Sequence, residues 1–565
     1  MRCNMRSAQK ILITKGKEND EKFKKLYEGR RRNGNSGDRI DHCGADCTGG
    51  TFQGEYQEAG YKYPEKDYRE REQDIMKCRI MRKNEDAYLT VYLSLVFGIV
   101  LSLLFALIEG AAIGAVRAQA ELVADLGLDS VFAEYNREIL EQYELFFIDS
   151  SYGGVNGGVG MVERHLSEYM SYNMNPDQDK PAFGGKTLLK LKNPYLEILE
   201  ASYASDDNCM VWKAQAVNYM KAVYGGDLVS TVKEHMDTVS ANGLTDRDVA
   251  AEVSQQMQEF EEALAEKGIL EYGAESEEGY SYQKVSGVFN TLVGGGILML
   301  TLPFGKTVSG AVMDGGPYFS SRMKNGRINQ GVGLHEGADR PDGIVNELIY
   351  GEYLMKMCGS YANPKEEGLL KYQIEYILFG MNSDAGNLRA CVEYLFAIRA
   401  VADTITISGD STRKAEAEAI AKLVCGLLCV PELSDILKAI ILGVWALAEA
   451  ASDVHHLLGG GEVPLIKDSS EWNTSLLDLF AGNFIGDEKN VTGLSYEDYL
   501  RVFLGLMNQD TKAARSIDIV EMDIRQTDGN EGFRIDRCMD YLKVGFGFAD
   551  ASGHDFVFQK IMCYE

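Results

Sequence analysis

Proline is scarce in this sequence, at 10 of 565 residues, and no low-complexity tract is present. Proline-rich and other biased segments are therefore excluded. Basic residues are also few: the chain has 57 Lys and Arg against 85 Asp and Glu, which gives a formal net charge of −28 at pH 7. Binding to nucleic acid and adhesion to anionic lipid headgroups both need basic residues, so this composition argues against both.

Catalytic signatures are absent as well. The sequence contains no His-Glu-x-x-His and no Gly-x-Ser-x-Gly. Gly305-Lys306-Thr307 ends like a phosphate-binding loop, but that motif requires glycine where Leu300 stands. We therefore predict no catalytic residue, no cofactor and no bound metal, and a protein that is not an enzyme.

The best metal-like grouping is Glu449, Asp453 and His456, which fall at i, i+4 and i+7 on one face of a predicted helix. Three such side chains could hold a hard or borderline cation. They precede residues 459–461, three glycines that mark a helix C-terminus. Histidines near a helix C-terminus more often interact with its carbonyl groups and dipole, and we favour that interpretation.

Cysteines number eleven, four in residues 1–86 and seven beyond residue 200. Seven is an odd number, so the second group cannot be fully paired in disulfides. Most of its members have apolar neighbours, where cysteine behaves as a small hydrophobic residue. We expect buried free thiols.

A single uncharged apolar run, residues 87–108, dominates the N-terminal part. Its 22 residues, at about 1.5 Å each, are enough to cross the hydrocarbon core of a bilayer, which is about 30 Å thick. A cleaved signal peptide, with a small-residue site at 118–120, is the alternative. The apolar run is longer than the usual 7–15 residues of such peptides, so we predict a retained transmembrane helix.

Charge around this run predicts its direction. Lys77, Arg79, Arg82 and Lys83 precede the run closely, whereas Arg117 alone follows it within twenty residues. Basic flanks stay in the cytoplasm. Residues 1–86 carry 20 Lys and Arg against 16 Asp and Glu, and residues 87–565 carry 37 against 69. We predict a cell-membrane protein with a cytoplasmic N-terminus and an extracytoplasmic C-terminal domain.

Residues 1–86 are predicted to be a disordered basic cytoplasmic tail, because mixed charges alternate with small polar residues and no apolar period is sustained. His42, Cys43 and Cys47 form only half of a zinc site. Met76 and Met81 each offer an alternative start, so the upstream tail could be an over-long gene start.

The helical pattern continues beyond the span as a predicted stalk, residues 109–150, with a bend expected at one of its glycines. Ala106, Gly110, Gly114 and Ala118 recur every four residues and share one face. Small residues in this spacing let two helices approach closely, so they are candidates for helix–helix association. The alternative is that this small-residue stripe packs on the protein's own domain.

Residues 151–565 are predicted to form a helix-rich extracytoplasmic α+β domain, with a possible subdivision near residue 280. We expect helices over 161–174, 209–223, 228–267 (interrupted near 242), 344–358, 369–380, 388–402, 415–429, 433–458 and 494–506. We expect strands over 195–203, 516–525 and 543–564. Residues 286–305 are uncharged but contain Pro303 and three consecutive glycines, so a buried strand and turn is favoured there over a second span.

Several stretches support a resemblance to a known family. Residues 85–153 carry the span, the Ile108-Glu109-Gly110 exit and the Leu-Phe-Phe-Ile-Asp end at 145–149. They resemble the N-terminal part of TadE/TadG-like proteins of bacterial tight-adherence pilus systems. They resemble more closely an uncharacterised clostridial-type domain of unknown function found with such systems. The stretches 371–388, 445–467, 496–506 and 517–525 resemble that second family too.

The resemblance implies an envelope role in pilus assembly and brings no catalytic residue. One departure is that no glycine lies in residues 81–86, where TadE-like pseudopilins are processed. We expect a single-pass membrane-anchored envelope protein with a structural or interaction role, whose partners are the bilayer and other pilus or envelope proteins. The alternatives are a membrane-tethered cell-envelope hydrolase, which needs a pocket joining acids with a histidine or metal, and a single-span sensor.

Overall fold

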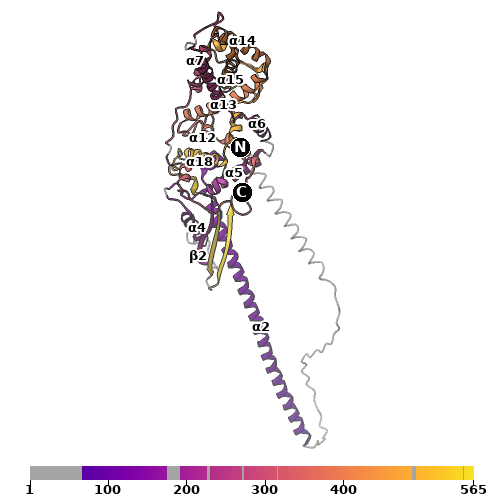
Figure 1. The fold of residues 1–565 in the computed structure, drawn as a ribbon. Helices are drawn as coiled ribbons and strands as arrows, with labels where there is room; N and C mark the ends of the chain where they lie inside the picture. Colours follow the sequence, from indigo (N-terminus) through magenta and orange to yellow (C-terminus); the bar gives the residue numbers. More distant parts are fainter. Residues whose placement is uncertain are drawn as a thin grey trace. The chain divides into compact units, whose positions relative to one another are not determined.

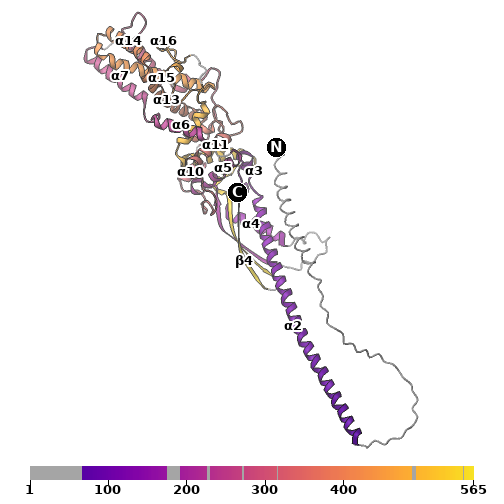
Figure 2. The same cartoon turned by 90° about the vertical axis from the view of Figure 1, so that its right-hand side faces the viewer.

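The structure is a computed structural model, and it describes residues 66–154, 156–174, 191–224, 229–269, 273–294, 296–314, 316–486, 492–550 and 553–564. The chain divides into two units, residues 1–100 and 101–565. The described part of the first unit is the N-terminal portion of helix α2. The second unit combines many helices with one small sheet, so the predicted α+β class is confirmed (Figures 1 and 2).

The elements follow one another in this order along the chain: α2 (Lys66–Phe132), α3 (Arg137–Tyr143), β1 (Ile148–Asp149), α4 (Val159–Met174), β2 (Leu191–Tyr203), α5 (Asp206–Tyr224), α6 (Ser230–Ala241), α7 (Val249–Glu266), α8 (Tyr282–Gly294), α9 (Ile297–Thr301), α10 (Phe319–Lys324), α11 (Ile344–Met357), α12 (Gln373–Phe379), α13 (Asp384–Gly409), α14 (Ser411–Leu427), η2 (Pro431–Leu433), α15 (Ser434–Gly459), η3 (Ser469–Glu471), α16 (Leu476–Phe480), α17 (Tyr496–Leu506), α18 (Gln509–Ile524), η4 (Ile535–Arg537), β3 (Cys538–Asp550) and β4 (Asp555–Cys563). Each of the nine predicted helices corresponds to a helix here, with 228–267 divided into α6 and α7 and with α13 extending seven residues beyond the predicted end at 402.

Helix α2 begins before the predicted span. It starts at Lys66, so residues 66–86 are helical and our expectation of disorder is wrong for them. This segment has neither glycine nor proline and is rich in Arg, Lys and Glu, which favour helix. Residues 1–65, with the half zinc site at 42–47, lie outside the described residues.

Helix α2 also ends earlier than the predicted stalk. It stops at Phe132, and α3 is a separate helix whose start is capped by Asn136, because the Asn136 side chain accepts a hydrogen bond from the Ile139 N–H at 3.1 Å. The expected bend does not interrupt α2. Four glycines lie within the continuous helix: Gly98, Gly110, Gly114 and Gly127. Glycine in a helix costs only about 1 kcal/mol, which neighbouring helical residues offset.

The sheet is antiparallel and β3 is its central strand. Strand β2 pairs along one edge of β3, while β4 and then β1 pair along the other. Residues from both ends of the second unit therefore meet in one sheet. The strands predicted over 195–203 and 543–564 are confirmed as β2 and as the β3–β4 hairpin.

One face of the sheet packs on α2 and α4. Apolar side chains of β3, of the C-terminal half of α2 and of α4 form a shared core: Leu542, Val544, Phe546, Phe548, Val123, Leu128, Leu166 and Met170. A Cβ at Gly127 would lie 3.0 Å from Leu166 Cδ1, so glycine allows α2 and α4 to approach. The C-terminal part of α2 is thus a core element of the second unit.

The helices share a second, larger core that contains residues from Ile139 to Cys538. Residues on both sides of position 280 contribute to it. In Figure 1, α7, α13, α14 and α15 gather at the end of this unit opposite the sheet. Every residue of α15 from Val444 to Val454 is buried, which is typical of a helix enclosed on all sides.

Two strand predictions are wrong. Residues 286–294 belong to α8 and residues 297–301 form α9, because Val285, Val288, Phe289 and Leu292 recur at helical spacing and pack inward. Residues 516–525 belong to α18. The alternation of apolar and acidic residues there suggested a strand, but acidic members of the segment are buried in the helix among polar partners.

Candidate functional site

Helix α2 is the one helix in the described chain that is long and apolar enough to cross a membrane. Its large side chains are exposed throughout this segment, as Leu95, Phe97 and Ile99 illustrate, each with more than three-fifths of its surface accessible. Farther along the helix, Val116 and Val123 are buried in the second unit. An apolar surface left uncovered over some twenty helical residues needs an apolar environment outside the chain.

The small-residue stripe is also uncovered. Ala106, Gly110, Gly114 and Ala118 are all exposed, and a Cβ built at either glycine would meet nothing within 4 Å. Packing of the stripe on the chain's own domain is therefore not seen. Its role in helix pairing stays a prediction.

The predicted buried thiols are confirmed for most of the described cysteines. No disulfide joins the described cysteines beyond residue 200, and five of them are buried: Cys209, Cys358, Cys391, Cys425 and Cys538. Burial raises the pKa of Cys358 to about 12 and that of Cys425 to about 11, so these thiols are poor nucleophiles at neutral pH. Cys429 is exposed.

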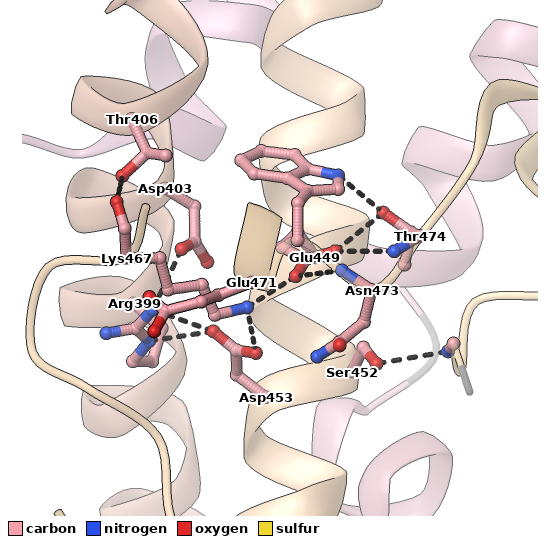
Figure 3. A network of polar contacts seen from close by, with 12 residues as sticks. Arg399, Asp403, Thr406, Glu449, Ser452, Asp453, Lys467, Glu471, Asn473 and Thr474 are labelled. Carbon is pink, nitrogen blue, oxygen red and sulfur yellow. Dashed lines mark hydrogen bonds and ion pairs between the residues drawn. The ribbon is translucent and has the colours of Figure 1, made fainter. Parts of the chain in front are cut away.

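Glu449 and Asp453 lie in a buried ion network between α13 and α15 (Figure 3). The Lys467 ammonium contacts both carboxylates. On the α13 side, Arg399 Nη2 donates to Asp453 Oδ2 at 2.7 Å and to Asp403 Oδ1 at 2.8 Å. Basic side chains thus occupy the carboxylates that could have served as metal ligands.

The same network fixes the segment that follows α15. Arg399 Nη1 donates to the Pro464 and Leu465 carbonyls at 2.8 Å each, and Glu449 accepts the N–H groups of Asn473 and Thr474 at 2.8 Å each. Figure 3 shows Arg399 and Glu449 extending from the two helices toward this segment, with Asn473 and Thr474 beside Glu449. The arrangement is structural, because its charged groups are enclosed and already paired.

Asp403 is a third acidic side chain of the network. Burial raises the pKa of the Asp403 carboxyl well above its ordinary value, although Arg399 opposes that rise. Among the described residues, Asp403 Oδ2 has no hydrogen-bond partner, which fits a protonated carboxyl.

His456 is not brought together with Glu449 and Asp453. It lines a separate cavity of about 240 Å³ with Ser452 and His455. No group of three potential metal ligands occurs among the residues that the structure describes.

A larger cavity, of about 560 Å³, lies beside the sheet. Four parts of the chain enclose it: the segment after α3, the exposed side of α5, residues 334–339, and the adjoining ends of β3 and β4. Its lining residues are Glu144, Leu145, Phe146, Val211, Ala214, Gln215, Asn218, Tyr219, Ala222, Leu334, His335, Gly337, Ala338, Asp339, Asp540, Cys563 and Tyr564. This size is typical of a small-molecule site.

A β-bulge places Asp540 at this cavity. Ser202 of β2 pairs with Tyr541, but the next residue, Tyr203, pairs with Met539, so Asp540 is the extra residue of β3. Bulges redirect a side chain and are frequent next to functional sites.

The Asp540 carboxyl is buried without a full set of hydrogen bonds. It is 3% exposed, and its Oδ1 makes no hydrogen bond within the described chain. Burial raises the pKa of Asp540 to about 7; the side chains of Gln215 and Ser202 lower it, and Asp206 adds to the rise. A buried carboxyl with a shifted pKa in a cavity is a candidate for function.

The His335 side of the cavity is held firmly. Asp206 accepts hydrogen bonds from the N–H groups of Gly331 at 2.8 Å and Gly333 at 3.2 Å, which fixes the loop leading to His335. The His335 ring stacks on Tyr541 with centroids 5.0 Å apart. Burial lowers the pKa of His335, and its Nδ1 has no partner in the part of the chain described.

The sequence analysis singled out none of the cavity residues as a functional residue. One signal was present: Asp540 has the same parity along β3 as Leu542, Val544 and Phe546, so it is an acid on an otherwise apolar face. No sequence pattern predicts the bulge that turns Asp540 toward the cavity.

Residues 275–550 match the model of a family of unknown function, DUF5702. The match covers just under half of the chain, from α8 into β3, and includes the buried ion network, His335 and Asp540. It excludes α2 and α5. Comparison with curated proteins and comparison with solved structures each find no match.

Proposed function

We propose that this chain is a single-pass membrane-anchored envelope protein that acts structurally, or through protein contacts, in assembly of a tight-adherence-type pilus or in surface attachment. The observation that carries this proposal is that α2 has both an exposed apolar part and a part buried in the second unit. One helix presents an exposed apolar surface over residues 88–108 and buries Val116, Val123 and Leu128 in the core that supports the sheet.

The exposed apolar residues and the buried residues belong to one uninterrupted helix. The predicted membrane anchor and a core element of the outer domain are thus the same element of the chain, which supports a structural role.

Orientation follows from the basic residues that precede the span, and the pilus connection from the resemblance of residues 85–153 to TadE/TadG-like proteins. The acidic body also fits the extracytoplasmic side, because segments rich in basic residues are the ones retained in the cytoplasm.

Thiol labelling in intact cells tests the topology, and the native cysteines make it simple. Cys429 is the exposed reporter in the second unit, and the five buried thiols are shielded. Replacing the four cysteines of residues 1–86 and the half-buried Cys563 with serine leaves Cys429 to report on the domain. Restoring Cys3 while Cys429 is serine gives the matched tail reporter.

We expect a membrane-impermeant maleimide to label Cys429 in intact cells and Cys3 only after the cells are opened, on a full-length, membrane-bound protein. Labelling of Cys3 in intact cells would reverse the orientation and refute the envelope role. Photocrosslinkers placed beside Gly114 should then capture pilus components; capture of none would leave the anchor and refute the pilus role.

A membrane-tethered hydrolase is the second candidate, because the 560 Å³ cavity joins Asp540 and two other acids with His335. The imidazole argues against it, since catalytic histidines are oriented by a second group and His335 Nδ1 has no partner among the described residues. Peptidoglycan zymography of the purified chain tests it. A lytic band that Asp540→Asn abolishes would favour the hydrolase over the scaffold.

A further inference from the structure

Asp540 needs a partner that the described chain does not provide. Its carboxyl is 3% exposed, and one of its oxygens accepts no hydrogen bond among the described residues. A buried carboxyl oxygen without a partner costs a folded protein free energy, and a ligand that donates a hydrogen bond to it would offset that cost. The bulge in β3 turns this residue out of the regular ladder and into the wall of the 560 Å³ cavity.

The charge of the cavity is one-sided. Asp540 lies within it, while Glu144 and Asp339 are exposed parts of its lining. Within the described ranges, no lysine or arginine lines the cavity. Lys356 contacts the lining residue Tyr219, because its ammonium donates to the Tyr219 hydroxyl at 2.6 Å. The cavity therefore favours a positively charged occupant.

The remaining walls are apolar and aromatic. Leu145, Phe146 and Val211 contribute hydrocarbon surface, and the Phe146 ring stacks on Tyr564 with centroids 5.6 Å apart. The volume is far larger than a metal ion needs, and hard cations require several oxygen ligands together. No such cluster of ligands occurs in the described residues. An organic cation fits the volume, the charge and the walls.

The unpaired oxygen distinguishes between organic cations. A carboxylate oxygen in a buried position is best satisfied by an N–H donor, and a charged donor gives the stronger bond. A quaternary ammonium has no N–H, whereas a primary ammonium has three. We propose that this cavity binds a small primary amine, whose ammonium group donates to Asp540 and whose carbon chain lies along Leu145, Phe146 and Val211.

The test uses the full chain in detergent micelles, with n-pentylamine as the probe and calorimetric titration as the measurement. Pentan-1-ol matches its shape without the charge, pentanoate reverses the charge, and tetramethylammonium is a cation without an N–H donor. We expect saturable binding of pentylamine, at least tenfold tighter than that of any of the three controls. Equal binding of pentan-1-ol would show that the cavity recognises only hydrocarbon and would overturn the proposal.

Two variants locate the site. Asp540→Asn keeps the shape and removes the charge, and it should weaken pentylamine binding at least tenfold. Asp339→Asn, at an exposed position of the lining, should weaken it less than threefold. Ala214→Leu adds side-chain volume to the cavity and leaves the Asp540 residue itself unchanged. It should also abolish binding, so a folding defect in one variant leaves the other decisive. Pentylamine binding that survives both Asp540→Asn and Ala214→Leu would refute the assignment.

Discussion

Arg399 on α13 and Asp453 on α15 form an ion pair from which water is fully excluded: Nη2 lies 2.7 Å from Oδ2, and neither side chain has any exposed surface. Such a pair adds little stability relative to an apolar pair of the same shape. Removing one partner of the pair is strongly destabilising, because the other charge then stays buried without that partner. The pair therefore selects this arrangement of α13, α15 and the segment after α15 over others.

The first prediction concerns this pair. Arg399→Leu should lower the free energy of unfolding of the second unit by about 3–5 kcal/mol, because Asp453 loses its guanidinium and the Pro464 and Leu465 carbonyls lose their donor. Urea unfolding of the full chain in detergent micelles, followed by tryptophan fluorescence, measures the change. Trp445 and Trp472 both contact Thr474, so they report on this region.

Arg389→Leu is the matched control on the same helix. Arg389 pairs with Glu393, and both side chains are at least half exposed. Exposed pairs of this spacing contribute less than about 1 kcal/mol, so the control should change the free energy of unfolding little. Equal effects of the two substitutions would mean that burial of the Arg399 pair does not matter.

The second prediction contrasts two helical glycines. A Cβ at Gly443 of α15 would lie 2.3 Å from Val253 Cγ2 of α7, and valine is too stiff to move aside. Gly443→Ala should therefore destabilise by about 1–3 kcal/mol through overpacking. At Gly287 of α8 a Cβ would meet nothing within 4 Å, so Gly287→Ala should stabilise by about 0.5–1 kcal/mol. Thermal unfolding of both variants checks the opposite signs, and a shared sign would contradict the close approach of α7 and α15.

The sequence predicts an element correctly when the residues that stabilise it are neighbours in the chain. Helix α15 was predicted from its own apolar run. Helix α18 was not, because its acids are satisfied from far away: Asp518 accepts from the Tyr376 hydroxyl at 2.9 Å, and Asp523 from the Tyr143 hydroxyl at 2.8 Å. In the sequence, a buried acidic residue cannot be distinguished from a solvent-exposed one unless its hydrogen-bond partner is known.

The candidate site follows the same logic. Glu449 and Asp453 were correctly placed on one helical face, but Lys467, which pairs with both, lies in a segment with no helical period. The sequence therefore suggested possible ligands and could not show that they were already paired. At Asp540 the deciding feature is a bulge, which depends on the register between β2 and β3 and on no local pattern.

The third prediction is a fall in stability as pH rises from about 5 to 8. Burial raises the pKa of Glu375 and Asp540 to about 7 each, and that of Asp518 and Asp523 to about 6 each. Below the ordinary carboxyl pKa both states are protonated. Above it the unfolded chain releases protons that the folded chain retains, so stability declines until pH passes the folded-state values. Urea unfolding at pH 5, 6, 7 and 8 measures the slope.

Glu375→Gln tests the assignment of that slope. Glu375 has no exposed surface and accepts hydrogen bonds from the Tyr361 N–H and the Tyr496 hydroxyl at 2.8 Å each, which a glutamine oxygen can also accept. At about 1.4 kcal/mol per pKa unit, the variant should remove on the order of 3 kcal/mol of the pH-dependent loss. Glu393→Gln, at an exposed position, should leave the slope unchanged. A slope unaffected by Glu375→Gln would mean that this carboxyl is ionised when folded.

The last prediction concerns the small-residue stripe of α2. Gly114→Ile adds a branched side chain on a face where a Cβ meets nothing within 4 Å, so the substitution should not disturb the chain's own packing. If α2 pairs with another copy or with another helix through Ala106, Gly110, Gly114 and Ala118, the added bulk separates the two backbones and association is lost. Cysteine crosslinking at position 107 in membranes measures pairing with a second copy. The crosslinked dimer should fall at least fivefold in Gly114→Ile and remain in Leu104→Ile, which changes shape but little volume. Crosslinking that persists in Gly114→Ile would assign the stripe no role in pairing between copies.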